Sequence, residues 1–501
     1  MSGSRHLVRC LSACAAAAAA MAGDASFLAQ EDAGDFGWSS RQAAAASLDT
    51  TSGFSRSIQQ VEPGWWGSAT LETGRGGLGV AYRRPGQGPV EQGFQATAAG
   101  TLHGAWGPCF ISVRPEMLVS LSDKGQHSVP DGDGRQEWTT SQSNRGMTLG
   151  RIQPVWRGTA GVTGLGHALI ASNEDFQWGE GVFGGLVFGR RWRGFPHVAL
   201  MAERPWRLDN FVGVPSSLYY EVIWGETTAQ RDNGPSRPQI LGGRLAMRVE
   251  DTTFSGTMAV MYGGSGKGNP GISKLFQFET GRENSTQTTN RVLSIGLSQI
   301  FAGDFVLAAE YGLDDWNPTY KPGRGYPDVG QAGYFNPQAA AWTLTADWLA
   351  VGGDPTWRLA AEWFRSENYW YGHSTYGAWS DQQAVLGHPD GGNANSFRVL
   401  LQHDGEDGGR TGLLGTWRRL GWRNGHSSAN TSWSGREGPP GSAVTAENEW
   451  DTWQLALQRS IPALGGQLGS DIGVELHDNY RFNTGRSRLG GWLMASYRID
   501  F

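Results

Sequence analysis

Cysteine is scarce in this chain of 501 residues, which contains only three. Two of them, Cys10 and Cys14, lie in an N-terminal stretch that we expect to be removed from the mature protein. Cys109 then stands alone, so a disulfide within the mature chain is excluded, and so are metal sites of the CxxC type.

Long uninterrupted hydrophobic runs are also missing. After the N-terminus, no stretch approaches the roughly 18 apolar residues that a membrane-spanning helix needs. The mean hydropathy of -0.41 points the same way. These absences argue against a helical membrane protein. They leave room for a membrane β-barrel, because only every second residue of a barrel strand meets lipid.

Lysine is nearly absent, and arginine supplies almost all of the positive charge. The net charge is -6 at pH 7, which is small for this length. Glycine and tryptophan, by contrast, are well above their usual shares, with 75 and 23 residues. Nucleic-acid recognition requires a basic face, so the charge balance argues against nucleic acid as a partner.

The last eleven residues, 491–501, alternate between apolar and mostly polar side chains. Successive strand side chains point to opposite faces, so this stretch predicts a strand with one apolar face. An aromatic residue that ends the chain in this phase resembles the C-terminal signal of bacterial outer-membrane β-barrels. That resemblance implies recognition by the barrel-assembly machinery through Leu493, Tyr497, Ile499 and Phe501.

Eight further segments with the same alternation precede this stretch. They lie near 291–301, 305–313, 339–350, 356–365, 395–403, 410–419, 451–460 and 467–478. Less regular segments upstream lie near 77–83, 93–102, 108–119, 147–153, 155–164, 197–204, 217–226, 239–249 and 254–263. Runs of about ten residues with a period of two are the signature of a membrane barrel. The sequence therefore predicts an all-β fold, a transmembrane antiparallel β-barrel of about 16–18 strands.

The connections between these segments alternate in length. Short turns are expected at 302–304, 352–355, 404–409 and 461–466, and long segments at 265–290, 314–338, 366–394 and 420–448. Bacterial barrels have short periplasmic turns and long extracellular loops. A soluble sandwich or propeller has no reason to alternate its loops in this way. The pattern predicts a protein of the bacterial outer membrane, in contact with its lipid and lipopolysaccharide.

Many tryptophans fall at the ends of the expected strands. They are Trp348, Trp357, Trp363, Trp417, Trp453 and Trp492. Amphipathic aromatic rings gather where a membrane meets water. We therefore expect these residues to belong to interfacial aromatic girdles.

The N-terminus has the features of a secretory signal peptide. Arg5 and Arg9 precede an uncharged, alanine-rich run, and Ala20-Met21-Ala22 fits a small-residue cleavage site. We expect residues 1–22 to be the signal peptide, 23–60 a periplasmic N-terminal segment and 61–501 the barrel.

Three stretches between residues 60 and 260 resemble the Wzi-like capsule-assembly family. The first runs from 92–94 through 105–108 to 113–116, the second joins 178–181, 194–197 and 203–205, and the third joins 224–226 and 242–245. The chain departs from the family pattern at 188–191, where Phe-Gly-Arg-Arg replaces a Ser-Asn-Asn run, and it has one tryptophan before Gly179 where the family has two. These departures bear on the ligand more than on the fold.

Proteins of that family are outer-membrane barrels that help to assemble capsule and behave as lectins. The resemblance therefore implies capsular or exopolysaccharide as the partner, without catalysis. Sugars suit aromatic faces combined with planar polar groups. The candidate polysaccharide-binding residues are Trp178, Glu180, Arg190, Arg191, Trp192, Arg193, Trp316, Tyr320, Trp370, Tyr371, Trp422, Arg423 and Trp433. The alternative for each aromatic cluster is that the loop packs on its own rings.

The run 190–193, Arg-Arg-Trp-Arg, is the densest positive patch in the chain. Guanidinium groups pair with carboxylates in a bidentate manner, so an acidic polysaccharide is one expected ligand. Two alternatives stay open, the phosphates of lipopolysaccharide and pairing with Glu180 and Asp175 within the protein.

A second class of function is a channel, either a porin or a polysaccharide-export pore. In that case charged residues such as Glu310, Arg358, Glu362 and Arg398 would line the lumen. An enzyme is not expected, because no nucleophile, base and orienting group can be assigned together. No cofactor and no metal site are expected.

Overall fold

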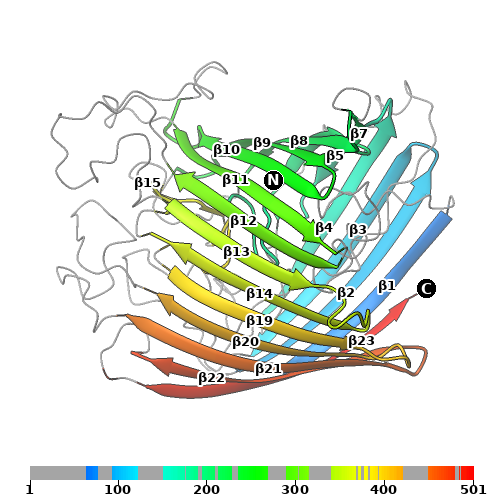
Figure 1. Cartoon of the computed structure of the whole chain (residues 1–501). Helices are drawn as coiled ribbons and strands as arrows, with labels where there is room; N and C mark the ends of the chain where they lie inside the picture. The colour runs from blue at the N-terminus through cyan, green and yellow to red at the C-terminus, as the bar shows by residue number, and fades with distance from the viewer. Residues whose placement is uncertain are drawn as a thin grey trace.

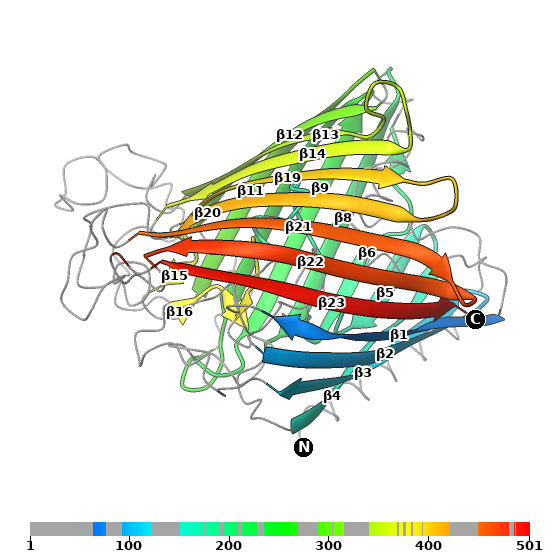
Figure 2. The same ribbon diagram turned by 90° about the horizontal axis from the view of Figure 1, so that it is seen from below.

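The computed structural model describes the strands and the segments that pack on them. The described residues are 64–76, 93–121, 151–174, 176–189, 194–208, 213–227, 235–268, 289–302, 304–314, 340–367, 370–373, 377–381, 384–392, 394–420, 449–479, 485 and 487–500. They form one large antiparallel sheet that closes on itself (Figures 1 and 2).

The strands of the first half are β1 (Gly64–Gly76), β2 (Gly93–Trp106), β3 (Cys109–Leu121), β4 (Arg151–Gly164), β5 (His167–Ser172), β6 (His197–Ala202), β7 (Trp206–Arg207), β8 (Ser216–Glu226), β9 (Gln239–Val249) and β10 (Thr252–Tyr262). The second half of the sheet has β11 (Thr289–Phe301), β12 (Phe305–Asp314), β13 (Ala340–Trp348), β14 (Trp357–Ser366), β19 (Ala394–Asp404), β20 (Arg410–Leu420), β21 (Trp450–Ala463), β22 (Gly466–Asp478) and β23 (Arg488–Asp500). Between β14 and β19 lie four two-residue strands, β15 (Gly372–His373), β16 (Gly377–Ala378), β17 (Ser380–Asp381) and β18 (Ala384–Val385).

The sheet closes because the first strand pairs with the last. Eight residue pairs join β1 to β23, from Ser68 opposite Asp500 to Arg75 opposite Leu493. β6 and β7 both pair with β8, so together they make one position in the wall, interrupted near Pro205. Closure leaves no exposed sheet edge, which a membrane requires since lipid cannot satisfy backbone polar groups. The structure therefore confirms an antiparallel barrel of 18 strand positions.

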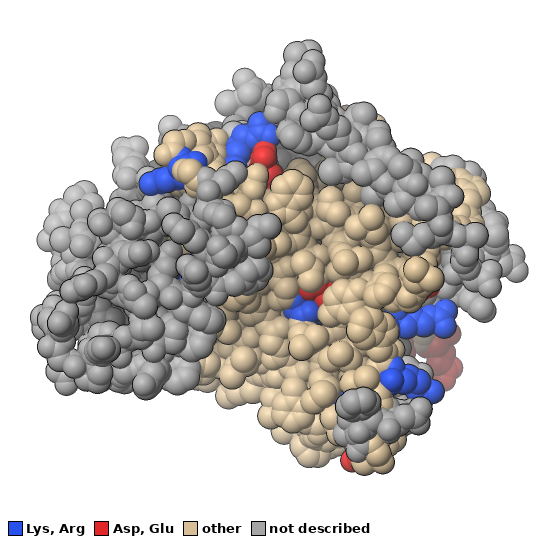
Figure 3. Space-filling view, turned by 90° about the horizontal axis from the view of Figure 1, so that it is seen from above, with Lys and Arg blue, Asp and Glu red and all other residues tan. Residues whose placement is uncertain are grey.

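The alternation in the sequence sets which side chains face the lumen. In β14, Arg358, Ala360, Glu362 and Phe364 are buried, and the residues that alternate with them are partly exposed. On the outer face, Leu344, Leu455 and many other large apolar side chains are about half exposed, as lipid-facing residues are in the absence of lipid. Figure 3 shows a face on which most described side chains are uncharged, with charged residues mainly at its margins.

The tight turns use positive φ angles. Leu165-Gly166 joins β4 to β5 with φ of 55° and 79°, and Leu464-Gly465 joins β21 to β22 with φ of 53° and 80°. Two central residues with positive φ are typical of the type I′ hairpin, whose twist matches that of the strands. The C-terminal end of β23 lies at the same end of the barrel as the β21–β22 turn (Figure 2).

The nine strands expected in the C-terminal half are all present, with bounds that differ by at most three residues. Upstream, the count is right although three assignments differ. The first strand is Gly64–Gly76, and 77–83 lies outside the described residues. The segments 147–153 and 155–164 correspond to one strand, β4, which runs on through Pro154, and the short strand β5 was not expected.

Aromatic residues form a belt across several outer strands. Trp363 lies opposite Phe397, which lies opposite Trp417, which in turn lies opposite Trp453. Trp348 ends β13 and Trp357 begins β14, so both lie beside the β13–β14 turn, at the other end of the barrel from this belt. Trp492 does not belong with them. It is 3 % exposed and faces the lumen, where its Nε1 donates to Asp471, so its assignment to a girdle was wrong because it lies in the inward phase of β23.

The expected signal peptide and N-terminal segment, 1–22 and 23–60, lie outside the described residues. Within the described part of the chain, no helix is long and apolar enough to cross a membrane.

Candidate functional site

The lumen of the barrel is occupied by two segments of the chain itself. One connects β5 to β6 and is described over 173–174 and 176–189. The other connects β14 to β19 and is described over 370–373, 377–381 and 384–392. We call these two segments together the lumen plug. Their side chains pack with inward-facing residues of the wall in one cluster of buried apolar groups.

The first segment folds back on itself around Trp178. The backbone N–H of Trp178 donates to the Phe188 carbonyl at 2.9 Å, and its indole Nε1 donates to Glu221 Oε2 of β8 at 2.7 Å. The Trp178 ring is fully buried and contacts Phe176 and Phe188 edge-on or tilted. A buried indole N–H needs a partner, and a wall carboxylate provides it.

Glycines allow the backbone of this segment to pack without side chains. A Cβ at Gly185 would lie 2.0 Å from the Trp178 carbonyl oxygen and 2.5 Å from that of Phe188. A Cβ at Gly181 would lie 2.0 Å from the Gly184 carbonyl oxygen. These approaches are closer than any side chain permits, so the tight fold of the segment depends on glycine.

Wall carboxylates accept hydrogen bonds from the backbone of the plug. Glu310 of β12 accepts from the Glu180 N–H at 3.2 Å, and Glu362 of β14 accepts from the Phe183 N–H at 3.0 Å. The Glu180 side chain in turn accepts from Ser255 Oγ of β10 at 2.8 Å, with Arg244 of β9 at 3.4 Å. Four strands within the β9–β14 part of the wall therefore hold one short segment.

The second segment fastens the first. Tyr371 Oη donates to the Leu186 carbonyl, Trp379 Nε1 donates to the Val187 carbonyl at 2.9 Å, and the Gly189 N–H donates to the Leu386 carbonyl at 2.8 Å. Trp370, Tyr371 and Trp379 are fully buried. Burial raises the pKa of the Tyr371 hydroxyl well above its usual range, so the hydroxyl stays protonated as a donor.

His388 and Asp390 attach the second segment to the wall. His388 Nε2 lies 3.1 Å from Glu362 Oε1, and its ring stacks on Phe364 with centroids 3.7 Å apart. Arg398 of β19 donates to Asp390 at 2.6 Å. Burial alone would raise the pKa of Asp390, but the positive charge of Arg398, with help from His388 and Arg418, lowers it below its ordinary value. Asp390 is therefore a carboxylate held by cations.

The plug brings together predicted residues that are almost two hundred positions apart in the sequence. Trp178, Trp370 and Tyr371 are fully buried, and Glu180 is 9 % exposed. These side chains pack the plug and present no open face to an external ligand. Their role in binding a sugar stays a prediction, and it would require the plug to move.

The other predicted binding residues lie outside the described residues. They are Arg190, Arg191, Trp192, Arg193, Trp316, Tyr320, Trp422, Arg423 and Trp433. Of the expected assembly signal, Leu493, Tyr497 and Ile499 lie in β23, with Leu493 and Ile499 well exposed on the outer face, while Phe501 lies outside the described residues.

Several plug contacts were not foreseen from the sequence. Glu221, Trp379, His388 and Asp390 carry no motif, and only Glu221 shows a usable signal, as a charged residue in the inward phase of an expected strand. Among the described residues, no group of three or more His, Cys, Asp or Glu side chains is arranged to hold a metal ion. The arrangement consists of hydrogen bonds and ion pairs that hold two connections inside the barrel.

No protein-family model matches this chain, and no curated protein matches it in sequence. Solved structures do resemble it. Wzi, an outer-membrane protein of Escherichia coli involved in group 1 capsule assembly and described as a carbohydrate-binding β-barrel, aligns with a TM-score of 0.57 at 13 % identity, over 88 % of this chain and 85 % of Wzi.

Two other barrels align less well. The outer-membrane protein OprD from Pseudomonas aeruginosa gives a TM-score of 0.44 at 11 % identity, over 87 % of this chain and 94 % of OprD. A BenF-like porin from Pseudomonas fluorescens gives 0.43 at 9 % identity, over 87 % of this chain and 99 % of the porin. At these identities the likeness to Wzi shows the fold, that of a bacterial outer-membrane β-barrel.

Proposed function

We propose that this protein binds capsular or exopolysaccharide at the bacterial cell surface, as a lectin-like component of its assembly and without catalysis. The observation that carries the proposal is the lumen plug. Charged wall residues that would line an open pore are bonded to the plug instead. Glu310 and Glu362 accept plug N–H groups, and Arg398 holds Asp390.

The fourth lumen charge expected in a pore, Arg358, is also engaged. It is fully buried and donates two hydrogen bonds of 2.7 Å to Asp347 on the neighbouring strand. A bidentate pair of this kind satisfies both charges locally. A wall whose charges are satisfied in this way supports a closed barrel that acts through its loops.

Two observations support a polysaccharide as the proposed ligand. One is the resemblance of residues 60–260 to the Wzi-like family, and the other is the fold of Wzi, a barrel that is described as binding carbohydrate. Within this chain, the proposed contact residues are the arginines and aromatics at 190–193, 316, 320, 422, 423 and 433. The long connections that contain them all leave the barrel at the end opposite the short turns.

Binding of purified protein to an array of bacterial capsular and exopolysaccharides tests this function. We expect saturable binding that weakens more than about a hundred-fold when Arg190 and Arg191 are both replaced by Glu, since each charge-assisted hydrogen bond contributes roughly 1.5–3 kcal/mol and each 1.4 kcal/mol is a factor of ten. The matched control replaces two exposed arginines nearer the short-turn end, Arg204 and Arg459, by Glu. If both double variants lost the same affinity for polysaccharide, the effect would come from net charge and not from the site.

The competing function is a channel, and its observable is conductance in planar bilayers. The closed barrel predicts a small conductance in the intact protein. A large, persistent conductance together with no binding to any glycan would contradict the lectin-like function and favour the channel. The fold would be unchanged by that result.

A further inference from the structure

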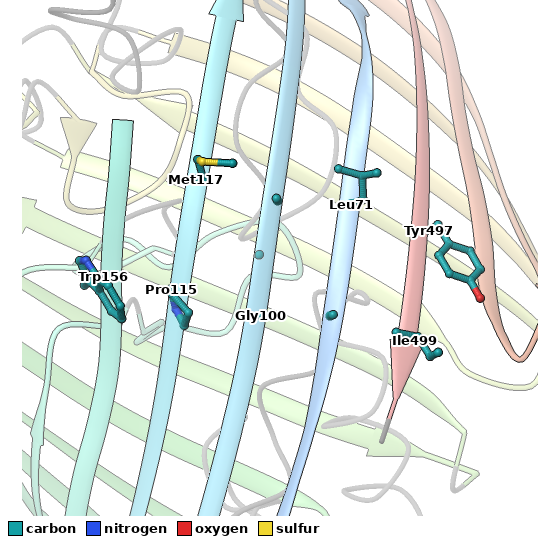
Figure 4. Close-up of a pocket in the computed structure, with 10 residues that line it drawn as sticks. Leu71, Gly100, Pro115, Met117, Trp156, Tyr497 and Ile499 are labelled. Carbon is teal, nitrogen blue, oxygen red and sulfur yellow. The ribbon is translucent and has the colours of Figure 1, made fainter. Parts of the chain in front are cut away.

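A groove of about 530 Å³ crosses the outer face of the barrel where the sheet closes. It extends over five neighbouring strands, β23, β1, β2, β3 and β4 (Figure 4). Its lining is made of Ala69, Leu71, Ala98, Ala99, Gly100, Pro115, Met117, Trp156, Tyr497 and Ile499. Five strands placed about 4.8 Å apart give the groove a length of roughly 19 Å.

The smallest side chains of the lining lie near the centre of the groove. Ile499 lies opposite Ala69, and Ala69 lies opposite Gly100. On the far side, Pro115 lies opposite Trp156, which is 66 % exposed and forms one end wall. The groove therefore has small residues in its centre and larger ones at both ends.

A proline contributes to this shape. The pairing of β2 with β3 is regular at Ala99–Glu116 and again at Leu102–Val113, but it is interrupted between them, at the level of Gly100 and Pro115. Proline has no N–H and removes a ladder hydrogen bond. The interruption is thus explained by the sequence, and it coincides with the centre of the groove.

Besides the indole N–H of Trp156 at one end, the lining has a single polar side-chain group. Its one hydroxyl, on Tyr497, donates to the Leu464 carbonyl at 2.8 Å. The surrounding outer face carries half-exposed Leu71, Leu493 and Ile499 and is the face that meets lipid in this fold. An occupant must therefore be apolar, flexible and present in the membrane itself.

The position along the barrel selects a leaflet. Leu464 belongs to the β21–β22 turn, and Ile499 is near the end of β23, so the groove reaches the short-turn end of the wall. Short turns face the periplasm in bacterial outer-membrane barrels. The lipid at that end is the phospholipid of the periplasmic leaflet.

We propose that this groove, the seam groove, holds one acyl chain of a periplasmic-leaflet phospholipid. A second copy of the chain is a poorer occupant, since a specific protein interface engages about 20–30 residues on each side and the groove presents ten. Lipid tails are as apolar as the wall, so retention depends on van der Waals fit and not on the hydrophobic effect. The shape of the groove is therefore what distinguishes it from the rest of the outer face.

The test is native mass spectrometry of the full-length barrel, purified from its membrane in detergent and then mixed with a defined phospholipid. We expect one phospholipid to remain bound per barrel. Ala98→Phe should fill the groove and lower the bound fraction about five-fold, in line with the 1–2 kcal/mol typical of packing in membranes. Ala309→Phe is the matched control, an equal change on the outer face of β12, away from the groove.

Equal lipid retention by the two variants, or no retained lipid in the unmodified protein, would overturn the proposal. Retained lipopolysaccharide in place of phospholipid would overturn the assignment to the periplasmic leaflet. If the unmodified protein were a dimer and Ala98→Phe dissociated it, the occupant of the groove would be a second copy of the chain and not an acyl chain. Cooperative thermal unfolding of each variant, followed by circular dichroism, shows whether it has folded, and Ala98→Leu is the milder substitute if the Phe variant has not. None of these outcomes depends on polysaccharide binding.

Discussion

The two faces of the barrel wall both follow from the alternation of side chains along each strand, but they place different physical demands on those side chains. On the outer face, a residue such as Leu455 needs only to be apolar, because lipid accommodates any apolar shape. On the lumen face, a residue such as Glu362 needs particular partners, since a buried charge without hydrogen bonds is costly. It finds them in the Phe183 N–H and His388, which belong to two different connections. Each strand by itself therefore determines which residues suit the outer face. Which residues suit the lumen face depends on partners that only the assembled molecule provides.

The largest effect is expected from placing the same charge on each face in turn. Leu455→Arg puts a guanidinium into lipid and should lower the free energy of unfolding by about 2–4 kcal/mol. Gln454→Arg, one residue away, points into the lumen opposite Glu475, whose carboxylate can pair with the guanidinium, so the loss should be smaller than for Leu455→Arg. Urea unfolding in lipid vesicles measures both. Equal losses would mean that the two faces do not differ as described.

The second-largest effect is expected from adding a side chain at Gly185, where the plug backbone packs closely. Gly185→Ala introduces a Cβ against two carbonyl oxygens of the plug. Overpacking of this kind costs about 1–3 kcal/mol, which we expect to be relieved by displacement of the plug. Planar-bilayer conductance should rise. Gly415→Ala on the outer face of β20, where the added Cβ meets no atom within 4 Å, should leave conductance unchanged.

A smaller effect is expected from removing one wall charge. Glu362→Gln keeps the shape of the side chain but weakens its hydrogen bonds with the plug, and it should destabilise the closed state by about 1.5 kcal/mol. Brief conductance openings are the expected readout. Glu406→Gln, in an exposed turn, is the control. An unaltered closed state in Glu362→Gln would show that the backbone contacts within the plug are sufficient to hold it.

The smallest effect concerns pH. Asp390 has a pKa below the ordinary 3.8 in the folded protein. A lowered pKa means that its contribution to stability is complete above about pH 3.8 and is lost as the pH falls through the folded value. Conductance should therefore stay low between pH 5 and 8. Asp390→Asn should reduce the acid dependence. Opening in the intact protein above pH 5 would assign the response to another group.

The fold was largely predictable from the sequence, because a lipid-facing strand shows its period directly. β12, β14 and β20 begin within one residue of their expected positions. Prediction is weaker where that period is interrupted, as at Pro154 in β4, or short, as in β5 with its six residues. Trp492 was misplaced because residue type was given more weight than phase.

The plug was not predictable in the same way. Its residues lie in connections that have no period, and their partners are distant in sequence. Trp178 and Tyr371 were selected for their aromatic rings, but nothing in the sequence indicates that Tyr371 meets the Leu186 carbonyl. The fit depends on glycines whose neighbours become apparent only in three dimensions.

The way the plug is attached has a consequence for biogenesis. Each of its two segments leaves and re-enters the wall at the same rim, opposite the short turns. Neither described plug segment has to be threaded through the ring, so insertion of the plug and pairing of β1 with β23 are topologically independent events. A barrel that has already sealed can still admit its plug from above. Closure of the ring and insertion of the plug can therefore take place in either order.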